Sequence, residues 1–526
     1  MLKEGKLWIG NTEDGREAYI LPGMANRHGI VCGATGTGKT VTLKVMAESF
    51  SAMGVPVFMA DVKGDIAGMM EPGADTEDMQ KRIEKFGLAD AGFSYSGCPV
   101  TLWDILGKKG IPLRTTISEI GPMLLARILA LNDLQSDILS IIFRIADESK
   151  LLLVDTKDLK AMLSWVSDHP EQYEGTYGKI SSASVGAIIR SIVALEADGG
   201  DVFFGEPALN IADWLTLGDG GKGMIHILDS SSLISNGRLY STFLLWMLSE
   251  LFETLPEVGD RAKPKMVFFF DEAHLLFDGA SKALLDKIEQ VVKLIRSKGV
   301  GVYFCTQNPK DIPDGVLSQL GNKIEHALRA YTLADQKAVK AAAQSFRPNP
   351  AFDTYEAITT LGTGQAVVSF LDENGVPGIA ERVSILPPQC SMASIRETMR
   401  DQCIKDSLLY SKYANAYDPE SAYEFLERQG QEEAAGRLRE AEAAAQAKEQ
   451  AKQEEREARA RERAEAAESR ARNRAIKSVG STVLGTVGRQ VGQSMGKSMG
   501  GSFGKTMGGN IGASLLRGIF GTLFKG

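Results

Sequence analysis

A run of nine residues near the start of the chain has the types and spacing that can hold a chain of phosphates. It contains the pattern G-x-x-x-x-G-K-[ST], with an apolar segment before it (28–34) and a helical pattern after it. Glycines let backbone N–H groups converge on phosphate oxygens, and the positive end of the following helix adds to the attraction. Since a strand and a helix flank the motif, we interpret it as a nucleotide-binding loop rather than a glycine-rich turn. Its expected nucleotide contacts are Gly33, Ala34, Thr35, Gly36, Thr37, Gly38, Lys39, Thr40 and Val41.

Two side chains of the loop and two distant carboxylates form a candidate hydrolytic set. Lys39 has the place of the lysine that reaches the β- and γ-phosphates, and the Thr40 hydroxyl has the place of a Mg²⁺ ligand. The apolar segment 265–271 ends in Asp271 and Glu272, which suit a second Mg²⁺ ligand and a general base that polarises water. Alone, an Asp-Glu pair after a strand could equally cap a helix. Together with the loop, the pair favours hydrolysis of a nucleoside triphosphate.

Three further polar residues are candidates for the same reaction. Gln307 ends the apolar segment 301–307, where an amide could sense the γ-phosphate or position water, although the following Asn-Pro is also a turn signal. Arg27 precedes the first strand and Arg296 ends the helix after Glu272, and either could neutralise charge on the transferred phosphoryl group, in cis or from a neighbouring subunit. A cation at a helix C-terminus is the alternative reading for Arg296.

The elements that must position these residues read as an α/β fold. Continuous apolar segments rich in Val, Ile and Phe alternate with helical patterns, which predicts a mainly parallel sheet buried on both faces. Two segments, 322–331 and 364–386, alternate like strands, and the second, with a turn at 373–375, predicts a closing β-hairpin. Residues 7–23 predict another hairpin at the start of the chain. The expected parallel strands are 28–34, 55–61, 223–229, 265–271 and 301–307.

The sequence predicts a discontinuous core and several attached segments. Residues 1–71 and 221–400 form the expected ATPase core, and 72–220 form a mainly helical insertion with helices at 119–148, 151–167 and 180–197. Residues 401–430 form a helical closing segment. Residues 431–475 hold 11 Glu and 11 Lys or Arg among many alanines, which predicts a solvated, semi-rigid helix without a coiled-coil seam.

The last 51 residues, 476–526, carry an unusual repeat. They contain 14 glycines, six basic residues and no acidic residue, and a glycine follows a large apolar residue at every fourth position from 488 to 512. On a helix such a stripe would suit close packing, but each interior glycine costs roughly 1 kcal/mol relative to alanine. We therefore expect this tail to need a partner protein or a membrane surface if it is ordered. A disordered glycine-rich tail is the alternative.

Composition limits the class of protein. The 526 residues have a net charge of −8 and include 44% hydrophobic and 24% charged residues, which indicates folded protein and argues against a histone-like coat of positive charge. The five scattered cysteines include no CxxC pair, so neither a disulfide framework nor a zinc site is indicated. No segment has the roughly 18 apolar residues that a membrane span needs, and we expect a cytoplasmic protein.

The motifs GATGTGKT, ADVKGD, FFFDEAH and RSKGVGVYFCTQNP occur in an order that resembles the HerA-like branch of the HerA/FtsK superfamily, close to the YjgR-type proteins. The resemblance covers roughly residues 20–425. It implies a RecA-like ATPase core that uses ATP and Mg²⁺, forms a homo-oligomeric ring, usually a hexamer, and moves double-stranded DNA. It also implies that Arg27 and Arg296 match arginine-finger or sensor positions and that Gln307 is a sensor. About 30 residues precede the loop, in place of the barrel that docks a nuclease in HerA, so we do not expect a NurA-type partner.

Three functions therefore compete. The first is a ring-forming ATPase that translocates or unwinds double-stranded DNA, for which Lys108, Lys109 and the region 310–323 are candidate pore segments. The second is an ATP-driven protein remodeller or a membrane-associated assembly ATPase tethered by its C-terminal tail. The third is a nucleotide-switched scaffold that barely hydrolyses ATP.

Overall fold

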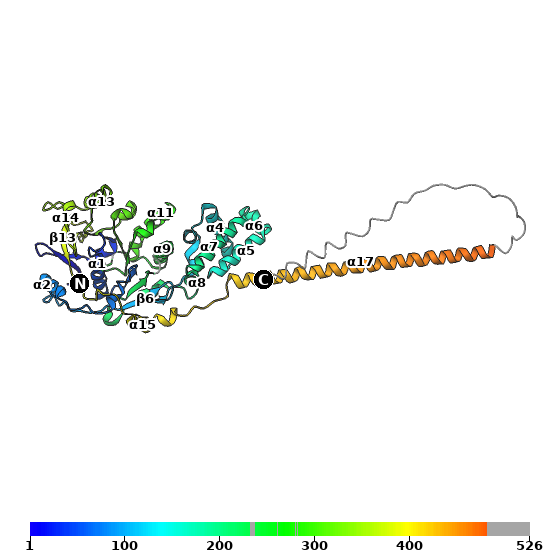
Figure 1. Ribbon diagram of the computed structural model, residues 1–526, viewed down its shortest axis with the longest axis horizontal. Coiled ribbons are helices and arrows are strands. Elements are labelled where there is room, and N and C mark those ends of the chain that lie inside the picture. Colours follow the sequence, from blue (N-terminus) through cyan, green and yellow to red (C-terminus); the bar gives the residue numbers. More distant parts are fainter. Residues whose placement is uncertain (232–236, 260, 279, 281, 481–526) are drawn as a thin grey trace. The chain divides into compact units, whose positions relative to one another are not determined.

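The computed structural model describes residues 1–231, 237–259, 261–278, 280 and 282–480 (Figure 1). The chain divides into a compact unit, Met1–Glu433, and a second unit that begins at Ala434. Most of the glycine-repeat tail predicted at 476–526 lies outside the described residues.

A single sheet of 13 strands forms the centre of the first unit, in the order β1-β2-β13-β12-β11-β4-β10-β9-β5-β8-β6-β7, with β3 also paired to β2. The strands from β11 to β7 in that order run parallel. All five predicted parallel strands are present, and the α/β fold class with a mainly parallel sheet is confirmed. The parallel strands are β4 (Gly29–Cys32), β5 (Val57–Asp61), β6 (Val100–Asp104), β7 (Ile111–Pro112), β8 (Ile225–Asp229), β9 (Met266–Phe270), β10 (Val300–Thr306) and β11 (Asn322–His326).

The remaining strands run antiparallel and close one side of the sheet. β12 (Gln365–Ser369) and β13 (Glu381–Ile385) pair with each other, and β13 also pairs with β2 (Lys6–Thr12). β2 pairs with β1 (Leu2–Lys3) and with β3 (Glu17–Ile20). Both predicted hairpins are therefore confirmed.

The central strands are buried because helices cover both faces of the sheet. Every residue of β4, β5, β9 and β10 is buried, which explains their continuous apolar sequences. One core face packs Phe58 against Trp214, with ring centroids 4.9 Å apart, and the other packs Phe269 against Tyr303 at 5.3 Å. The helices of the core are α1 (Lys39–Ala52), α9 (Gly237–Thr254), α10 (His274–Phe277), α11 (Lys282–Ile295), α12 (Asp314–Leu317), α13 (Leu333–Gln344) and α14 (Thr354–Thr360).

Residues 72–220 are mainly helical, but they also contribute β6 and β7, which extend the parallel sheet beyond β8. Figure 1 shows α4, α5, α6 and α7 gathered in one group. The helix expected at 119–148 is two helices, because Asn132 caps a new helix with a capping box and Ala130 has a positive φ of 54°. The helices are α2 (Glu77–Phe86), α3 (Ile117–Ile128), α4 (Asp133–Glu148), α5 (Thr156–Asp168), α6 (Pro170–Tyr177), α7 (Ser182–Ala197) and α8 (Gly200–Phe203).

Three helices follow the sheet: α15 (Glu397–Asp406), α16 (Tyr410–Tyr413) and α17 (Ala422–Gly480). The predicted charged helix begins nine residues earlier than expected, because Ala422 and Leu426 are buried in the core of the first unit. Within the described residues no single helix is long and apolar enough to cross a membrane. In the same part of the chain, only α6 and α7 taken together have the length and composition of a membrane span, and these two helices are bent by 101° relative to each other.

Candidate nucleotide-binding site

The loop between β4 and α1 has a backbone that only glycine accommodates at two points. Gly33 and Gly38 have φ of 149° and 115°. A Cβ at Gly33 would lie 2.5 Å from the Cβ of His326, and one at Gly38 would lie 3.3 Å from the backbone of Gly364. The loop is tied to the neighbouring strands by backbone bonds, since Ala34 N donates to Ala327 O and Gly364 N donates to Thr37 O, each at 2.9 Å. These bonds from the neighbouring strands therefore fix the shape of the loop.

Lys39 lies inside the loop. Its Nζ donates to Gly33 O at 2.6 Å and to Ala34 O at 3.1 Å, and the residue is 7% exposed. The ammonium group therefore occupies the concave side of the loop and satisfies two carbonyls there. Thr40 is the second residue of α1 and is partly exposed. Both side chains stand where a bound polyphosphate would meet the positive end of α1.

Parallel pairing brings the tips of three other strands to the same edge of the sheet. Thr306 of β10 pairs with Cys32 of β4, and Phe304 of β10 pairs with Phe270 of β9. The residues that follow these strands, Gln307 and Asp271, therefore leave the sheet beside the loop. The next strand in the sheet, β5, pairs with β9 and ends at the same edge.

Glu272 is the centre of a chain of polar contacts at this edge. Its carboxylate accepts from Gln307 Nε2 at 3.4 Å and pairs with Lys63 Nζ at 3.1 Å. On the other side, Thr35 Oγ1 of the loop donates to Gln307 Oε1 at 3.4 Å. His274 Nδ1 lies 3.4 Å from the second carboxylate oxygen. The candidate base is thus joined to the phosphate-binding loop through one glutamine side chain.

The backbone of Glu272 is held in an unusual conformation. Its φ is 49°, in the left-handed region that non-glycine residues rarely adopt, and the residue is only 8% exposed. Such a conformation costs of order 1–3 kcal/mol and persists where the surroundings fix it. Here it turns the side chain toward Gln307 and Lys63.

Asp271 is buried at the tip of β9. Its Oδ1 accepts from the backbone N of Glu272 at 3.0 Å, and its carbonyl accepts from the Tyr240 hydroxyl of α9 at 3.0 Å. Burial and the adjacent Glu272 charge raise the pKa of Asp271, and the Lys63 ammonium only partly opposes them. A nearby cation would stabilise the charged form of this buried carboxylate. Together with the Thr40 hydroxyl it offers the hard oxygen donors that fit Mg²⁺.

Arg27 and Arg296 lie at the other edge of the sheet. Arg27 precedes β4, so about 3.3 Å of rise per residue places it roughly 15–20 Å from Gly33, and its guanidinium lies against Gly375 in the turn after β12. Arg296 precedes the seven-residue strand β10. With burial, its charge lowers the pKa of His28, at the start of β4, to about 4. Both arginines therefore lie at the ends of the strands opposite to the loop of their own chain, and the role of each in cis or from a neighbouring subunit stays a prediction.

Comparison with known families agrees with this geometry. The family described as helicase HerA-like C-terminal matches residues 6–524. The chain belongs to this family. The resemblance seen in the motifs is thereby confirmed, and by fold and family this HerA-like chain is a P-loop NTPase.

Among curated relatives, the HerA-like chain is 22% identical over 379 residues to the DNA double-strand break repair helicase HerA of Sulfurisphaera tokodaii. The aligned residues make up 70% of this chain and 67% of that protein. It is 30% identical over 146 residues to a probable helicase of Methanocaldococcus jannaschii, covering 27% of this chain and only 26% of that protein.

Two solved structures are similar to this chain at low sequence identity. The conjugative coupling protein TrwB has a TM-score of 0.48 at 14% identity and covers 75% of this chain and 93% of its own. VirB4 of Thermoanaerobacter pseudethanolicus has a TM-score of 0.46 at 14% identity and covers 76% of this chain and 99% of its own.

Sequence reasoning missed three polar residues of the HerA-like site. Lys63 follows β5 in the motif ADVKGD, and His274 lies two residues after Glu272. His326 lies beneath the loop, where Nδ1 bonds Gln365 O and Nε2 bonds the Thr42 hydroxyl, both at 2.9 Å. Burial lowers the pKa of His326 to about 4, so it is neutral at pH 7 and accepts from Thr42.

Asp61, the last residue of β5, is held by the loop that follows it. It accepts from the backbone N–H groups of residues 64 to 67, at distances of 2.7 to 3.3 Å. Burial raises its pKa to about 6 despite these bonds. Asp61 therefore acts as a turn former that shapes the loop carrying Lys63.

Replacing Lys63 with methionine tests whether this lysine positions Glu272. We expect turnover at saturating ATP to fall by about tenfold or more, because the carboxylate loses its closest charged partner. The KM for ATP should change less than about threefold, since Lys63 does not contact the loop. Steady-state hydrolysis without DNA measures both.

Two variants complete this test. Lys63→Arg keeps the cation and should keep most of the turnover. Lys310→Met removes an exposed lysine near the tip of β10 and should leave both constants unchanged. A loss confined to KM, or an equal loss in Lys63→Arg, would contradict the positioning role.

Proposed function

We propose that this HerA-like chain hydrolyses ATP at the edge of the sheet where β4, β9 and β10 end. One observation carries the proposal: the Thr35–Gln307–Glu272 contacts join the phosphate-binding loop to a buried carboxylate 3.4 Å from the glutamine amide. In the reaction, Lys39 exchanges its carbonyl partners for the β- and γ-phosphate oxygens. Glu272 accepts a proton from the attacking water, and the Gln307 amide orients that water or senses the γ-phosphate.

Thr40 and Asp271 would hold the metal ion of this reaction. Their oxygens are the donor types that Mg²⁺ prefers, and the raised pKa of Asp271, caused by burial and by Glu272, leaves its charge in need of a cation. Bound Mg²⁺ would neutralise charge on the phosphate oxygens.

The energy of hydrolysis drives movement along double-stranded DNA. Support comes from membership of a helicase family across residues 6–524 and from the relative named DNA double-strand break repair helicase HerA. The five cysteines are free in the structure, in keeping with the cytoplasm as its compartment.

The working form would be a homo-oligomeric ring, and we propose a hexamer. Arg27 and Arg296 lie at the sheet edge opposite their own loop. If either stabilises charge on the transferred phosphoryl group, a neighbouring subunit must deliver it. A ring of identical subunits packed head to tail gives each loop such a neighbour.

The second candidate, an assembly or remodelling ATPase tethered by its tail, has support from charge alone. Residues 1–475 carry a net charge of −14, whereas 476–526 carry +6. An acidic body weakens attraction to DNA phosphates, and a basic, apolar tail suits an anionic membrane.

DNA stimulation of ATP hydrolysis separates these functions. We expect double-stranded DNA to raise turnover and the effect to fall steeply between about 50 and 200 mM salt, as phosphate contacts require. Glu272→Gln should still bind ATP but lose at least about 100-fold in turnover, and Lys39→Ala should lose nucleotide binding. Stimulation by anionic vesicles and not by DNA would favour the tethered ATPase. Full turnover in Glu272→Gln would exclude its role as general base.

Mixed rings test delivery of an arginine by a neighbour. Arg296→Ala and Lys39→Ala subunits should each be inactive alone, whereas a 1:1 mixture restores about a quarter of the sites, those that pair an intact loop with an intact arginine. The same mixture with Arg27→Ala examines the other candidate. Full activity of an arginine variant alone, or no recovery on mixing with material confirmed to exchange subunits, would contradict the proposal for that residue.

A further inference from the structure

The order of the strands sets the direction of a bound triphosphate along the edge of the sheet. Gln307 and Glu272 follow β10 and β9, which lie on one side of β4, whereas β11 and β12 lie on the other side. The γ-phosphate has to face Glu272, because the attacking water is activated there. The nucleoside at the opposite end of the triphosphate therefore leaves the loop on the side of β11 and β12.

α2 covers the start of α1 on that side of the loop. Its residues Ile83 and Phe86 belong to the same apolar cluster as Val41, the third residue of α1. Lys85 Nζ donates to Ser384 Oγ of β13 at 3.2 Å, which connects the helix to the antiparallel strands on the far side of β11. α2 thus lies next to the place where the nucleoside leaves the loop.

Arg82 of α2 extends its guanidinium to the residue that precedes β12. A Cβ on Gly364 would lie 3.3 Å from Arg82 Nη1 and 3.4 Å from Nη2, so the guanidinium lies directly against this glycine. Gly364 in turn contacts the nucleotide-binding loop, because its N donates to Thr37 O at 2.9 Å and its Cα would lie 3.3 Å from a Cβ on Gly38. One glycine residue therefore separates Arg82 from the loop.

The guanidinium of Arg82 is partly buried and has no hydrogen-bond or ion-pair partner among the described residues. Its neighbour Lys81, by contrast, lies 3.9 Å from Asp78. A guanidinium is planar and weakly hydrated, so it stacks well on the face of an aromatic ring. Because Gly364 lacks a side chain, the guanidinium can lie this close to the loop. Arg82 thus offers a stacking surface where the nucleoside leaves the loop.

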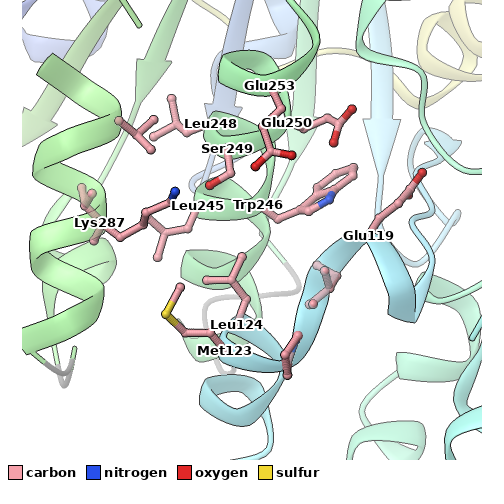
Figure 2. Close-up of a pocket in the computed structure, with 15 residues that line it drawn as sticks. Glu119, Met123, Leu124, Leu245, Trp246, Leu248, Ser249, Glu250, Glu253 and Lys287 are labelled. Carbon is pink, nitrogen blue, oxygen red and sulfur yellow. The ribbon is translucent and has the colours of Figure 1, made fainter. Parts of the chain in front are cut away.

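A cavity elsewhere in the first unit is unsuited to the nucleotide. It has a volume of about 300 Å³ between α3, α9 and α11, and none of its described lining residues belongs to the nucleotide-binding loop. Three glutamates outweigh Lys287 in this lining, and they are Glu119, Glu250 and Glu253. Figure 2 shows Glu250 and Glu253 on the same helix, α9. The net negative charge of the lining repels phosphates, so this cavity does not compete with the loop for the nucleotide.

We propose that the purine base of the bound nucleotide stacks on the guanidinium of Arg82. The inference rests on the proposed hydrolysis of ATP and adds the residue that holds the nucleoside half of the ligand. Stacking uses the face of the ring and not its substituents, so Arg82 raises the affinity for purine nucleotides in general. It lies at the end of the ligand opposite to Glu272, so it does not take part in the hydrolytic step.

Ligand binding without hydrolysis tests the proposal in the full-length protein. Calorimetric titration with ADP and with inorganic triphosphate, each in the presence of Mg²⁺, separates contacts to the nucleoside from contacts to the phosphates. We expect Arg82→Ala to weaken the binding of ADP by about tenfold, because the base loses its stacking partner. The affinity for inorganic triphosphate, which has no ring, should change less than about twofold. Turnover at saturating ATP should also stay within about twofold.

Three further variants separate stacking from charge. Arg82→Phe supplies a flat ring without a charge and should keep the affinity for ADP within about threefold of the wild type. Arg82→Lys keeps the charge but has no planar group, so it should bind ADP about as weakly as Arg82→Ala. Lys81→Ala removes the neighbouring cation, whose side chain is 72% exposed, and is the control that should leave both affinities unchanged.

The outcomes distinguish this inference from the function on which it rests. Unchanged affinity for ADP in Arg82→Ala, an equal loss of affinity for inorganic triphosphate, or full rescue by lysine would overturn the role of Arg82 and leave the proposed hydrolysis of ATP intact. A wild-type protein that binds neither ADP nor inorganic triphosphate would overturn the proposed function, and the role of Arg82 with it.

Discussion

The contact between Glu272 and Gln307 depends on a constraint that acts on the whole core: β4, β10, β9 and β5 must be parallel, adjacent and in register. β10 lies between β4 and β9, so Gln307 stands between the loop and the carboxylate. A shift of one residue in β10 would turn its side chains to the opposite face and move Gln307 out of reach. The buried apolar strands thus fix a polar arrangement at their ends.

Electrostatics explains why the site is poised for a ligand. Asp271 and Glu272 are adjacent carboxylates that are each less than 10% exposed, and two such charges repel in a poorly solvated place. Lys63 offsets part of this repulsion. Although partial burial lowers it, Asp271 and Glu272 together raise the pKa of Lys63. The Lys39 ammonium group donates hydrogen bonds to the carbonyl oxygens of Gly33 and Ala34 in the loop. A magnesium-bound triphosphate would supply both the missing cation and the missing anion.

Much of this arrangement could be predicted from the sequence, because apolar strands and loop motifs are local signals. The segments that became β4, β9 and β10 are continuous apolar runs, and each ends in its polar residue. Lys63 was missed because β5 and β9 are neighbours in the sheet although about 200 residues separate them, and pairing over that distance leaves no mark in a single sequence. β6 and β7 were missed because they are short, five and two residues, and lie within a helical region. The arginines illustrate the same limit, since their distance along the chain from the loop does not reveal the edge on which they lie.

The most direct measurement is a structure of the protein with Mg²⁺ and a non-hydrolysable ATP analogue, at a resolution that shows side chains and water. The account predicts Lys39 Nζ within hydrogen-bond distance of the γ-phosphate, with Glu272 and Gln307 bonded to one water in line with that phosphate. A triphosphate bound elsewhere, or bound in the loop while Glu272 stays too distant for even a bridging water, would contradict it.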